Sequence, residues 1–177
     1  VVGYKKAFGE DSVPISYADI ELADTFLITG ANPAWCHPIL FRRIEKRKEE
    51  NPNVKIIVID PRKTDTANFA DLHLQLKPGT DVVLYNAIAR RLYKRGLIDE
   101  NFIKKHTQGF DDYKKIILNT NLRKASKICG VSEDDIEKAA EIIGVSKGFI
   151  SMWAMGLNQS VVGTDKNVSL LNLSLIT

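Results

Sequence analysis

The apolar positions of this chain fall into short continuous runs and longer mixed segments, and the two kinds predict different elements. TFLITG at 25–30 and VKIIVID at 54–60 are continuous, which is typical of strands covered on both faces of a parallel sheet. Between them, ILFRRIEKRKEEN at 39–51 mixes apolar and charged positions after Pro38, a residue that suits the first turn of a helix. Residues 25–61 are therefore predicted to form a strand, a loop, a helix and a second parallel strand.

The same pattern assigns individual side chains to the core. Ile39, Leu40 and Ile44 are expected to form the buried face of the helix that follows the first strand. Ile20 and Leu22 are the expected anchors of the short polar segment SYADIELADT. These assignments predict that one face of each segment packs against the sheet.

The rest of the chain continues to alternate between strand and helix patterns. DLHLQL at 71–76 alternates apolar and polar positions and predicts a half-exposed strand, and GFISMWAMG at 148–156 predicts a further apolar strand. Helical spacing and capping residues predict helices within residues 80–96, 99–106, 110–119 and 131–144. This alternation indicates a three-layer α/β fold, with a mostly parallel sheet and helices on both faces, and a single domain over residues 1–177.

Composition narrows the possible functions only a little. The 177 residues are 44% hydrophobic and 27% charged, and the net charge of +3 is too small and too dispersed to indicate nucleic acid as a partner. No apolar run reaches the roughly 18 residues that span a bilayer, so no membrane partner is expected. Cys36 and Cys129 form no ligand pattern, the three histidines show no metal-ligand spacing, and the expected location is cytoplasmic.

Four loops that follow predicted strand ends carry the residues with the most potential for chemistry. They are TGANPAWCHP, IDPRKT, LKPGTD and MGLNQSVVGTDKN. In an open parallel sheet such loops meet at one edge, where ligands bind. Their shared richness in Gly, Pro, Asn, Asp and Thr therefore predicts a polar ligand site beyond the carboxyl ends of the strands.

Each loop alone also has an ordinary structural explanation. The first contains Gly30 but neither a dinucleotide glycine fingerprint nor a P-loop, so it is either a plain turn or an anion site at a helix N-terminus. Asp60 either ends a strand in a turn or accepts ribose hydroxyls, with Arg62 and Lys63 beside it for a phosphate. Asp81 is either a helix N-cap or a carboxylate that accepts two parallel N–H donors of a guanine. Both alternatives stay open at each position.

Taken together and in order, the segments resemble the molybdopterin-dependent oxidoreductases. The resemblance is carried by GYKKAFGEDSVP, YADIELAD, GANPAWCHPILFRR, VKIIVIDPRKT, ADLHLQLKPGTDV, GLIDENFIKKHTQGF, ICGVSEDDI and WAMGLNQSVVGTDKN, which cover essentially the whole chain. MGLNQS with GTDKN is similar to the nitrate reductases, and NPAWCHP is similar to their assimilatory, cytoplasmic branch. DPRKT is shared with the formate dehydrogenases, which are the alternative subfamily.

The resemblance implies molybdenum held between two molybdopterin guanine dinucleotides, and reduction of nitrate to nitrite by oxygen-atom transfer. By motif, the first loop would line the phosphate region of a dinucleotide, the second its ribose and phosphates, the third its guanine, and the fourth the pterin and metal pocket. The residues implied for these four contacts are, in order, Gly30, Ala31 and Asn32; Asp60, Pro61, Arg62 and Lys63; Gly79, Thr80 and Asp81; and Met155 and Gln159.

The resemblance also implies what the chain lacks. The family's 4Fe-4S cluster motif and its metal-ligating cysteine are not in this sequence, so we expect no metal ligand, no catalytic residue and an inactive internal piece of a longer enzyme. The implied partners are the remaining domains of that polypeptide, an electron-donor protein or subunit, and nitrate. The alternatives are the corresponding domain of a formate dehydrogenase, a nucleotide-binding module without a redox role, and a purely structural domain.

Overall fold

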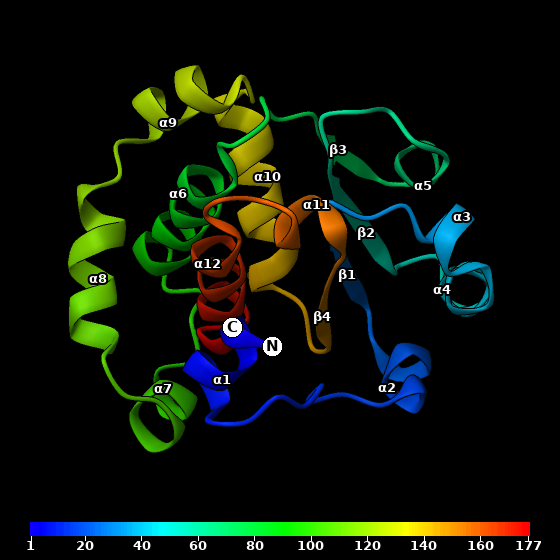
Figure 1. Ribbon diagram of the computed structural model, residues 1–177, viewed down its shortest axis with the longest axis horizontal. Coiled ribbons are helices and arrows are strands. Elements are labelled where there is room, and N and C mark those ends of the chain that lie inside the picture. The colour runs from blue at the N-terminus through cyan, green and yellow to red at the C-terminus, as the bar shows by residue number, and fades with distance from the viewer.

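Four strands form one parallel sheet in the computed structural model, which describes residues 1–177 (Figure 1). They are β1 (Thr25–Thr29), β2 (Lys55–Ile59), β3 (Leu72–Leu74) and β4 (Phe149–Trp153), and they lie in the order β3-β2-β1-β4. Thr29 is aligned with Ile59 on one side and with Trp153 on the other, so β1, β2 and β4 end at the same edge. The polar loops that follow these strands consequently meet there.

Twelve helices precede, connect and follow the strands. Those outside the segment between β3 and β4 are α1 (Val2–Phe8), α2 (Tyr17–Leu22), α3 (Pro33–Cys36), α4 (Pro38–Glu50), α5 (Asp65–Asn68), α11 (Met155–Asn158) and α12 (Gly163–Leu175). Those between β3 and β4 are α6 (Asp81–Lys94), α7 (Glu100–His106), α8 (Phe110–Asn119), α9 (Leu122–Cys129) and α10 (Glu133–Gly144). None of the helices combines the length and the apolar character needed to cross a bilayer.

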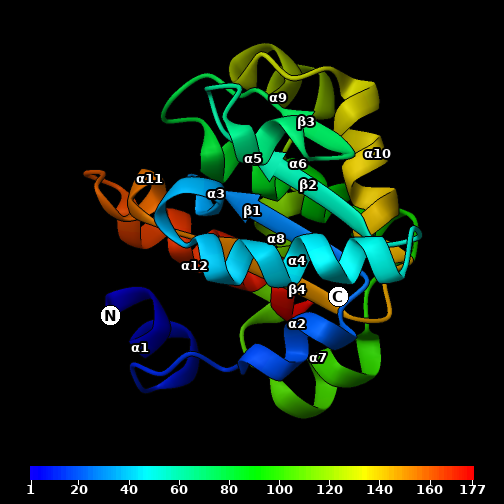
Figure 2. The same ribbon diagram turned by 90° about the vertical axis from the view of Figure 1, so that its right-hand side faces the viewer.

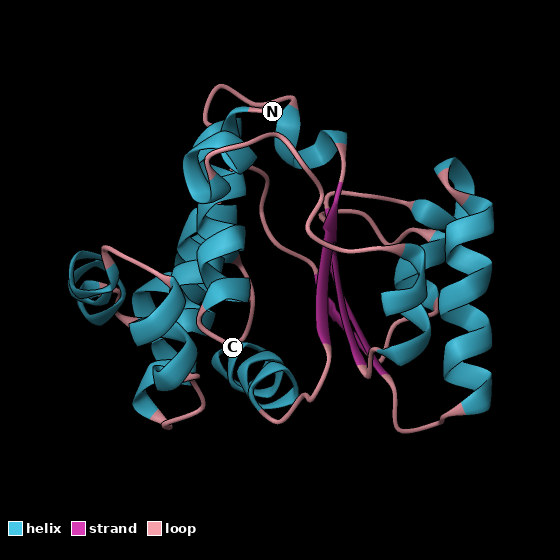
Figure 3. Ribbon diagram, turned by 90° about the horizontal axis from the view of Figure 1, so that it is seen from below, coloured by secondary structure: helices cyan, strands magenta, loops and turns pink.

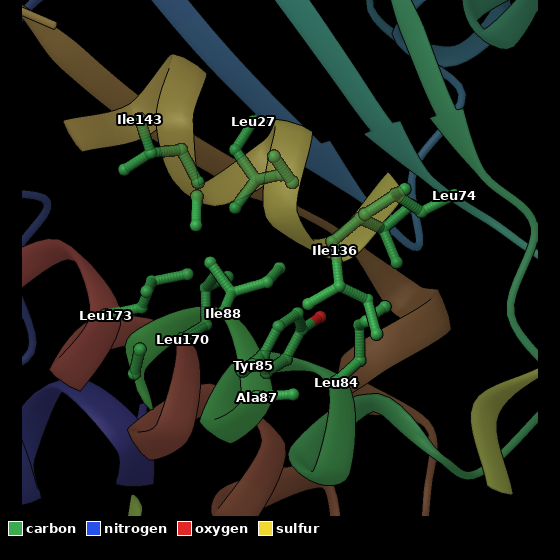
Figure 4. Close-up of a cluster of buried hydrophobic side chains, with 14 of the residues drawn as sticks. Leu27, Leu74, Leu84, Tyr85, Ala87, Ile88, Ile136, Ile143, Leu170 and Leu173 are labelled. Atoms are coloured by element: carbon green, nitrogen blue, oxygen red, sulfur yellow. The ribbon is translucent and has the colours of Figure 1, made fainter. Parts of the chain in front are cut away.

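Helices cover both faces of the sheet, which gives the molecule three layers (Figure 3). On one face, 25 buried apolar residues join the sheet to helices that include α6, α10 and α12, and Figure 4 shows part of this cluster around Tyr85 and Ile88. On the other face, 10 buried residues join it to α2, α4 and α5, and Figure 2 shows α4 lying across that face. The predicted three-layer α/β fold is therefore confirmed, and burial on both faces explains the continuous apolar runs of the central strands.

Two of the individual core assignments are wrong. Ile44 and Ile20 are buried as expected, but Ile39 is 77% exposed and Leu22 is 75% exposed. Ile39 lies in the first turn of α4, where Phe41 is buried in its place, and Leu22 is the last residue of α2. Both errors fall at helix ends, where fewer neighbouring elements are available to cover a side chain.

The fourth polar loop is shorter than the sequence indicates. Residues 155–158 form α11, and α12 begins at Gly163, five residues before the apolar run that starts at Val168. Gly163 allows this tight entry, because a Cβ there would lie 2.7 Å from the carbonyl oxygen of Asn158. The residues GTDK of the last motif therefore form the first turn of a helix and project from a fixed backbone.

Trp153, the last residue of β4, has a packing role. It packs against the larger core cluster, and its ring centroid lies 5.2 Å from that of Tyr4 in α1. The neighbouring Gly3 lies so close to α12 that a Cβ on it would be 2.8 Å from the Cβ of Asn167. The first helix of the chain is thus fixed against the last one, beside the end of β4.

Candidate functional site

The strand-end loops enclose a cavity of about 350 Å³ at the carboxyl edge of the sheet. Residues from the loops after β1, β2, β3 and β4 line it, together with one side chain from α12. Four segments that are far apart in the sequence therefore meet as the sheet topology requires. Volumes of this size are typical of sites for small molecules and cofactors.

Two glycines bring the first and fourth loops into backbone contact beside the cavity. The amide of Gly156 donates a hydrogen bond to the carbonyl oxygen of Gly30 at 3.0 Å. Gly30 has a φ of 55°, in the left-handed region that favours glycine. A Cβ on Gly156 would lie 2.6 Å from both the Cα and the carbonyl oxygen of Gly30, so no other residue fits there without a shift of the backbone.

Asn32 is held in one orientation by a residue from the segment after β2. Its Oδ1 accepts hydrogen bonds from the hydroxyl of Thr66 at 2.7 Å and from the Thr66 amide at 3.4 Å. The Thr66 hydroxyl in turn accepts a hydrogen bond from the amide of Ala34 at 3.2 Å, and Thr66 is fully buried. Because Oδ1 is occupied, the amide group of Asn32 offers only its N–H donors to a ligand in the cavity that it lines.

Asp60 is buried at the end of β2, and its loop is braced from β3. Its Oδ1 accepts a hydrogen bond from the amide of Arg62 at 2.8 Å. The His73 Nε2 lies 2.9 Å from the Asp60 carbonyl oxygen, and the Gln75 side chain donates to the Pro61 carbonyl oxygen at 2.9 Å. The Arg62 guanidinium is exposed and lies 4.0 Å from the carboxylate, so it stays available to an anion at the mouth of the cavity.

Asp81 forms an ion pair with a residue that the sequence did not single out. It is the first residue of α6, after the N-cap Thr80, and its carboxylate makes no capping hydrogen bond. Its Oδ2 lies 2.8 Å from the Nζ of Lys166 in α12, and both residues are buried. The two charges are in contact without the alignment of a hydrogen bond, so Oδ2 has no hydrogen-bond partner. The N-cap alternative for Asp81 is therefore wrong, because Thr80 holds the cap position and the carboxylate is turned toward α12.

A second buried polar contact lies one helical turn behind Asp81. The Tyr85 hydroxyl is 2.6 Å from the Thr29 hydroxyl at the end of β1. Burial raises the pKa of Tyr85, the hydrogen bond with Thr29 lowers it, and the charge of Asp81 raises it further, for a net increase. Tyr85 is consequently a neutral hydrogen-bonding group that ties α6 to the end of β1.

Nine of the twelve residues implied by the motifs line this one cavity. They are Gly30, Ala31, Asn32, Asp60, Pro61, Arg62, Gly79, Asp81 and Met155. Lys63, Thr80 and Gln159 are not part of its lining; Lys63 and Gln159 are exposed, and the Thr80 hydroxyl donates to the Lys77 carbonyl oxygen at 2.7 Å. Lys166 was missed, although it lies in the GTDKN motif. Placing the start of α12 at Gly163 would have identified it as a residue of a helical first turn.

Another hollow, of about 400 Å³, lies on the outer helices between α3, α4 and α5. Its charged side chains have partners of their own: Arg42 and Glu45 are 3.4 Å apart, and Asp65 accepts a hydrogen bond from Trp35. None of the twelve residues implied by the motifs lines it. The cavity that contains Asp60 and Asp81 is therefore the candidate site.

Comparison with known proteins gives consistent matches over the whole chain. The family model "Molybdopterin oxidoreductase" matches residues 4–177. The chain is 46% identical to a nitrate reductase of Synechocystis sp., over 100% of the chain and 25% of that protein. It is 43% identical to the "F420-dependent formate dehydrogenase subunit alpha" of Methanocaldococcus jannaschii, over 100% of the chain and 26% of that protein.

A solved structure has the same fold. Acetylene hydratase from Pelobacter acetylenicus matches with a TM-score of 0.85 and 25% sequence identity, over 99% of this chain and 23% of that one. The chain thus spans about a quarter of the length of the curated relatives it matches.

Proposed function

The chain belongs to the molybdopterin oxidoreductase family, and on that basis we propose that it is a cofactor-binding domain of a larger molybdenum enzyme that reduces nitrate to nitrite. The observation that carries this proposal is the convergence of the four motif loops on one cavity with two buried carboxylates, Asp60 and Asp81. The family's cofactor is built on molybdopterin, and we propose that here it is the guanine dinucleotide form. The chain itself would supply binding and orientation without a catalytic group.

The residues of the cavity suit a nucleotide-bearing group. A carboxylate repels phosphate but accepts hydrogen bonds from sugar hydroxyls and base N–H groups, so Asp60 and Asp81 fit the ribose and base. Phosphate suits cations and backbone amides instead, which Arg62 and the loop that begins at Gly30 provide. Gly30 and Gly156 let the backbones of the first and fourth loops touch, which brings these two walls of the cavity together.

Each residue would act by holding or excluding a part of the bound group. When bound, the molybdenum cofactor supplies the two-electron chemistry that removes an oxygen atom from nitrate. The amide N–H of Asn32 would donate to a phosphate or pterin oxygen, with its orientation set by Thr66. The thioether of Met155 would cover an apolar part of the pterin. Gln159 is the exposed C-cap residue of α11, close in sequence to the start of α12.

Nitrate is favoured as the substrate by the motifs and by the relatives together. MGLNQS and GTDKN are similar to those of nitrate reductases, and the chain is 46% identical to one of them. A formate dehydrogenase is the second candidate, because the whole length of this chain is 43% identical to part of a formate dehydrogenase subunit.

Either enzyme would need further domains, an electron-donor partner and, in our proposal, a 4Fe-4S cluster held elsewhere in the polypeptide. We also propose a cytoplasmic location, from the resemblance of NPAWCHP to the assimilatory branch.

The substrate is tested on the complete polypeptide, produced without oxygen in a host that makes molybdenum cofactor. Oxidation of reduced viologen is followed with nitrate, and reduction of oxidised viologen is followed with formate. We expect nitrite to form in the first assay and no turnover in the second. Formate oxidation without nitrite formation would contradict the proposed substrate and favour the second candidate.

A further inference from the structure

The burial of Lys166 inside the cavity calls for a physical explanation. Its exposed fraction is only 5%, and lysine carries a heavy desolvation cost when it is buried. It also lies in the first turn of α12, where the helix dipole disfavours a positive charge. Asp81 offsets part of this cost at 2.8 Å. A pair that only fastened α12 to α6 would have no need to line a cavity, yet both residues do.

The ion pair leaves the two groups unequally available to a ligand. Oδ2 of Asp81 is fully buried beside Lys166, so Oδ1 is the oxygen that this residue can offer to the cavity. An ammonium group has three N–H donors, and the ion pair with Asp81 engages at most one of them. The cavity therefore presents one carboxylate acceptor and one ammonium donor side by side.

This arrangement differs from recognition of guanine by a single carboxylate. In that arrangement both oxygens of Asp81 would accept the two parallel donors of guanine, N1–H and the 2-amino group. Here Oδ2 is taken. Guanine also has an acceptor, O6, directly beside N1–H, so an adjacent acceptor and donor on the protein can read that pair instead.

We propose that Lys166 is a specificity-determining residue that reads the base together with Asp81. Asp81 Oδ1 accepts N1–H and Lys166 Nζ donates to O6; this rests on the proposed function, in which the cavity holds the nucleotide of the cofactor. Adenine presents an acceptor at N1 and a donor at the neighbouring position, so it places the wrong group opposite each partner. Hypoxanthine has the same N1–H and O6 as guanine and lacks only the 2-amino group. The proposal therefore predicts that the 2-amino group contributes little.

The test is calorimetric titration of the complete polypeptide, prepared without its cofactor, with GDP, IDP, ADP and inorganic pyrophosphate. On the wild type we expect IDP to bind within about threefold of GDP, and ADP to bind at least about tenfold more weakly, since a hydrogen bond to a charged group is lost. Lys166→Met is expected to weaken GDP and IDP at least about tenfold and to leave pyrophosphate unchanged. Lys147→Met, at an exposed lysine beside the amino end of β4, is the matched control and should change nothing.

Each other outcome counts against a specific part of the account. Preference for GDP over IDP by tenfold or more on the wild type would mean that both oxygens of Asp81 read the base, and would overturn the proposal. Equal losses for GDP, ADP and pyrophosphate in Lys166→Met would make Lys166 a phosphate contact and also overturn it. The wild-type comparison of GDP and IDP decides the matter even if Lys166→Met fails to fold. No binding of any nucleotide to the wild type would instead contradict the proposed function of the cavity.

Discussion

The amide of Gly156 donates a hydrogen bond to the carbonyl oxygen of Gly30 at 3.0 Å, and this contact joins the loop after β4 to the loop after β1. It sets the spacing of two walls of the cavity, because neither residue has a side chain to hold the loops apart. The geometry of the site therefore depends on two positions that contribute no functional group.

Gly156→Ala tests this dependence. The new Cβ would lie 2.6 Å from Gly30, and we expect a loss of about 1–3 kcal/mol in the free energy of unfolding together with weaker nucleotide binding. Urea denaturation and calorimetry measure the two effects. Gly9→Ala is the control: its φ of 83° makes alanine strained, but no atom lies within 4 Å of the new Cβ. It should lower stability without changing the affinity for a nucleotide, and equal binding losses in both variants would argue against the loop contact.

Thr66→Val removes the hydroxyl that orients Asn32 while keeping the shape of the side chain. The Ala34 amide loses its acceptor and Asn32 loses its closest donor, so we expect a loss of about 1–3 kcal/mol in stability. Thr66→Ser keeps the hydroxyl and loses one methyl group, which costs about 0.8 kcal/mol. Ligand affinity separates the two variants: it should fall in Thr66→Val and persist in Thr66→Ser. The orienting role of Thr66 is refuted if both variants bind equally well.

Asp24, which directly precedes β1 at the edge of the sheet opposite the cavity, makes the stability of the fold depend on pH in the acid range. Partial burial raises the pKa of Asp24, but hydrogen bonds from Ser146, Lys147, Thr25 and Gly148 lower it, and the net shift is downward from 3.8. The folded state therefore binds this proton less readily than the unfolded state does. The stabilisation is present above about pH 4 and is lost as the pH falls through the lowered pKa.

Asp24→Asn should consequently flatten the dependence of unfolding free energy on pH below about pH 4. Thermal unfolding at a series of pH values between about 2 and 6 measures this slope. Asp111→Asn, at an exposed position in the first turn of α8, is the comparison. If the free energy of unfolding fell as steeply below about pH 4 in Asp24→Asn as in the wild type, the hydrogen bonds to this carboxylate would contribute nothing to the acid dependence of stability.

Two tyrosines, the fully buried Tyr85 and the partly buried Tyr113, make stability sensitive to alkaline pH. Burial is the largest cause that raises the pKa of Tyr85 and of Tyr113 above 10.0. Because the pKa of each tyrosine is higher in the folded state than in the unfolded state, the free energy of unfolding is unaffected by their ionisation below about pH 10. It falls as the pH rises beyond that value. Tyr85→Phe should reduce that fall, while costing about 1 kcal/mol at neutral pH through the lost contact with Thr29. Denaturant unfolding at neutral pH and above pH 10 measures both effects. If the free energy of unfolding of Tyr85→Phe fell above pH 10 as steeply as that of the wild type, Tyr85 would not be a cause of the fall.

The sheet and the place of the site could be predicted from sequence for a physical reason. β1 and β2 are covered on both faces, so the residues in the middle of each strand had to be apolar, and such runs are visible without any structure. The polar residues after them had to lie at one edge because parallel strands share a direction. The position of Asp60 at this edge could be predicted from these two facts alone, because Asp60 directly follows β2.

The partners of those residues could not be predicted, because they depend on contacts between distant segments. Lys166 reaches Asp81 across 85 positions, and Thr66 reaches Asn32 across 34. Neither separation leaves a periodic signal. The start of α12 could not be predicted either, because the polar residues of its first turn have the composition of a loop. Only the close approach of Gly163 to the Asn158 carbonyl oxygen in the structure shows where the helix begins.

The central claim is that the cavity at the carboxyl edge of the sheet holds the nucleotide of a molybdopterin cofactor. The most direct measurement is the molybdenum and guanine nucleotide content of the complete purified polypeptide, for the wild type, Asp60→Ala/Asp81→Ala and the surface control Lys147→Met. We expect both contents to fall together in the double variant and to stay at the wild-type level in the control. Full molybdenum and nucleotide content in the folded double variant would contradict the claim.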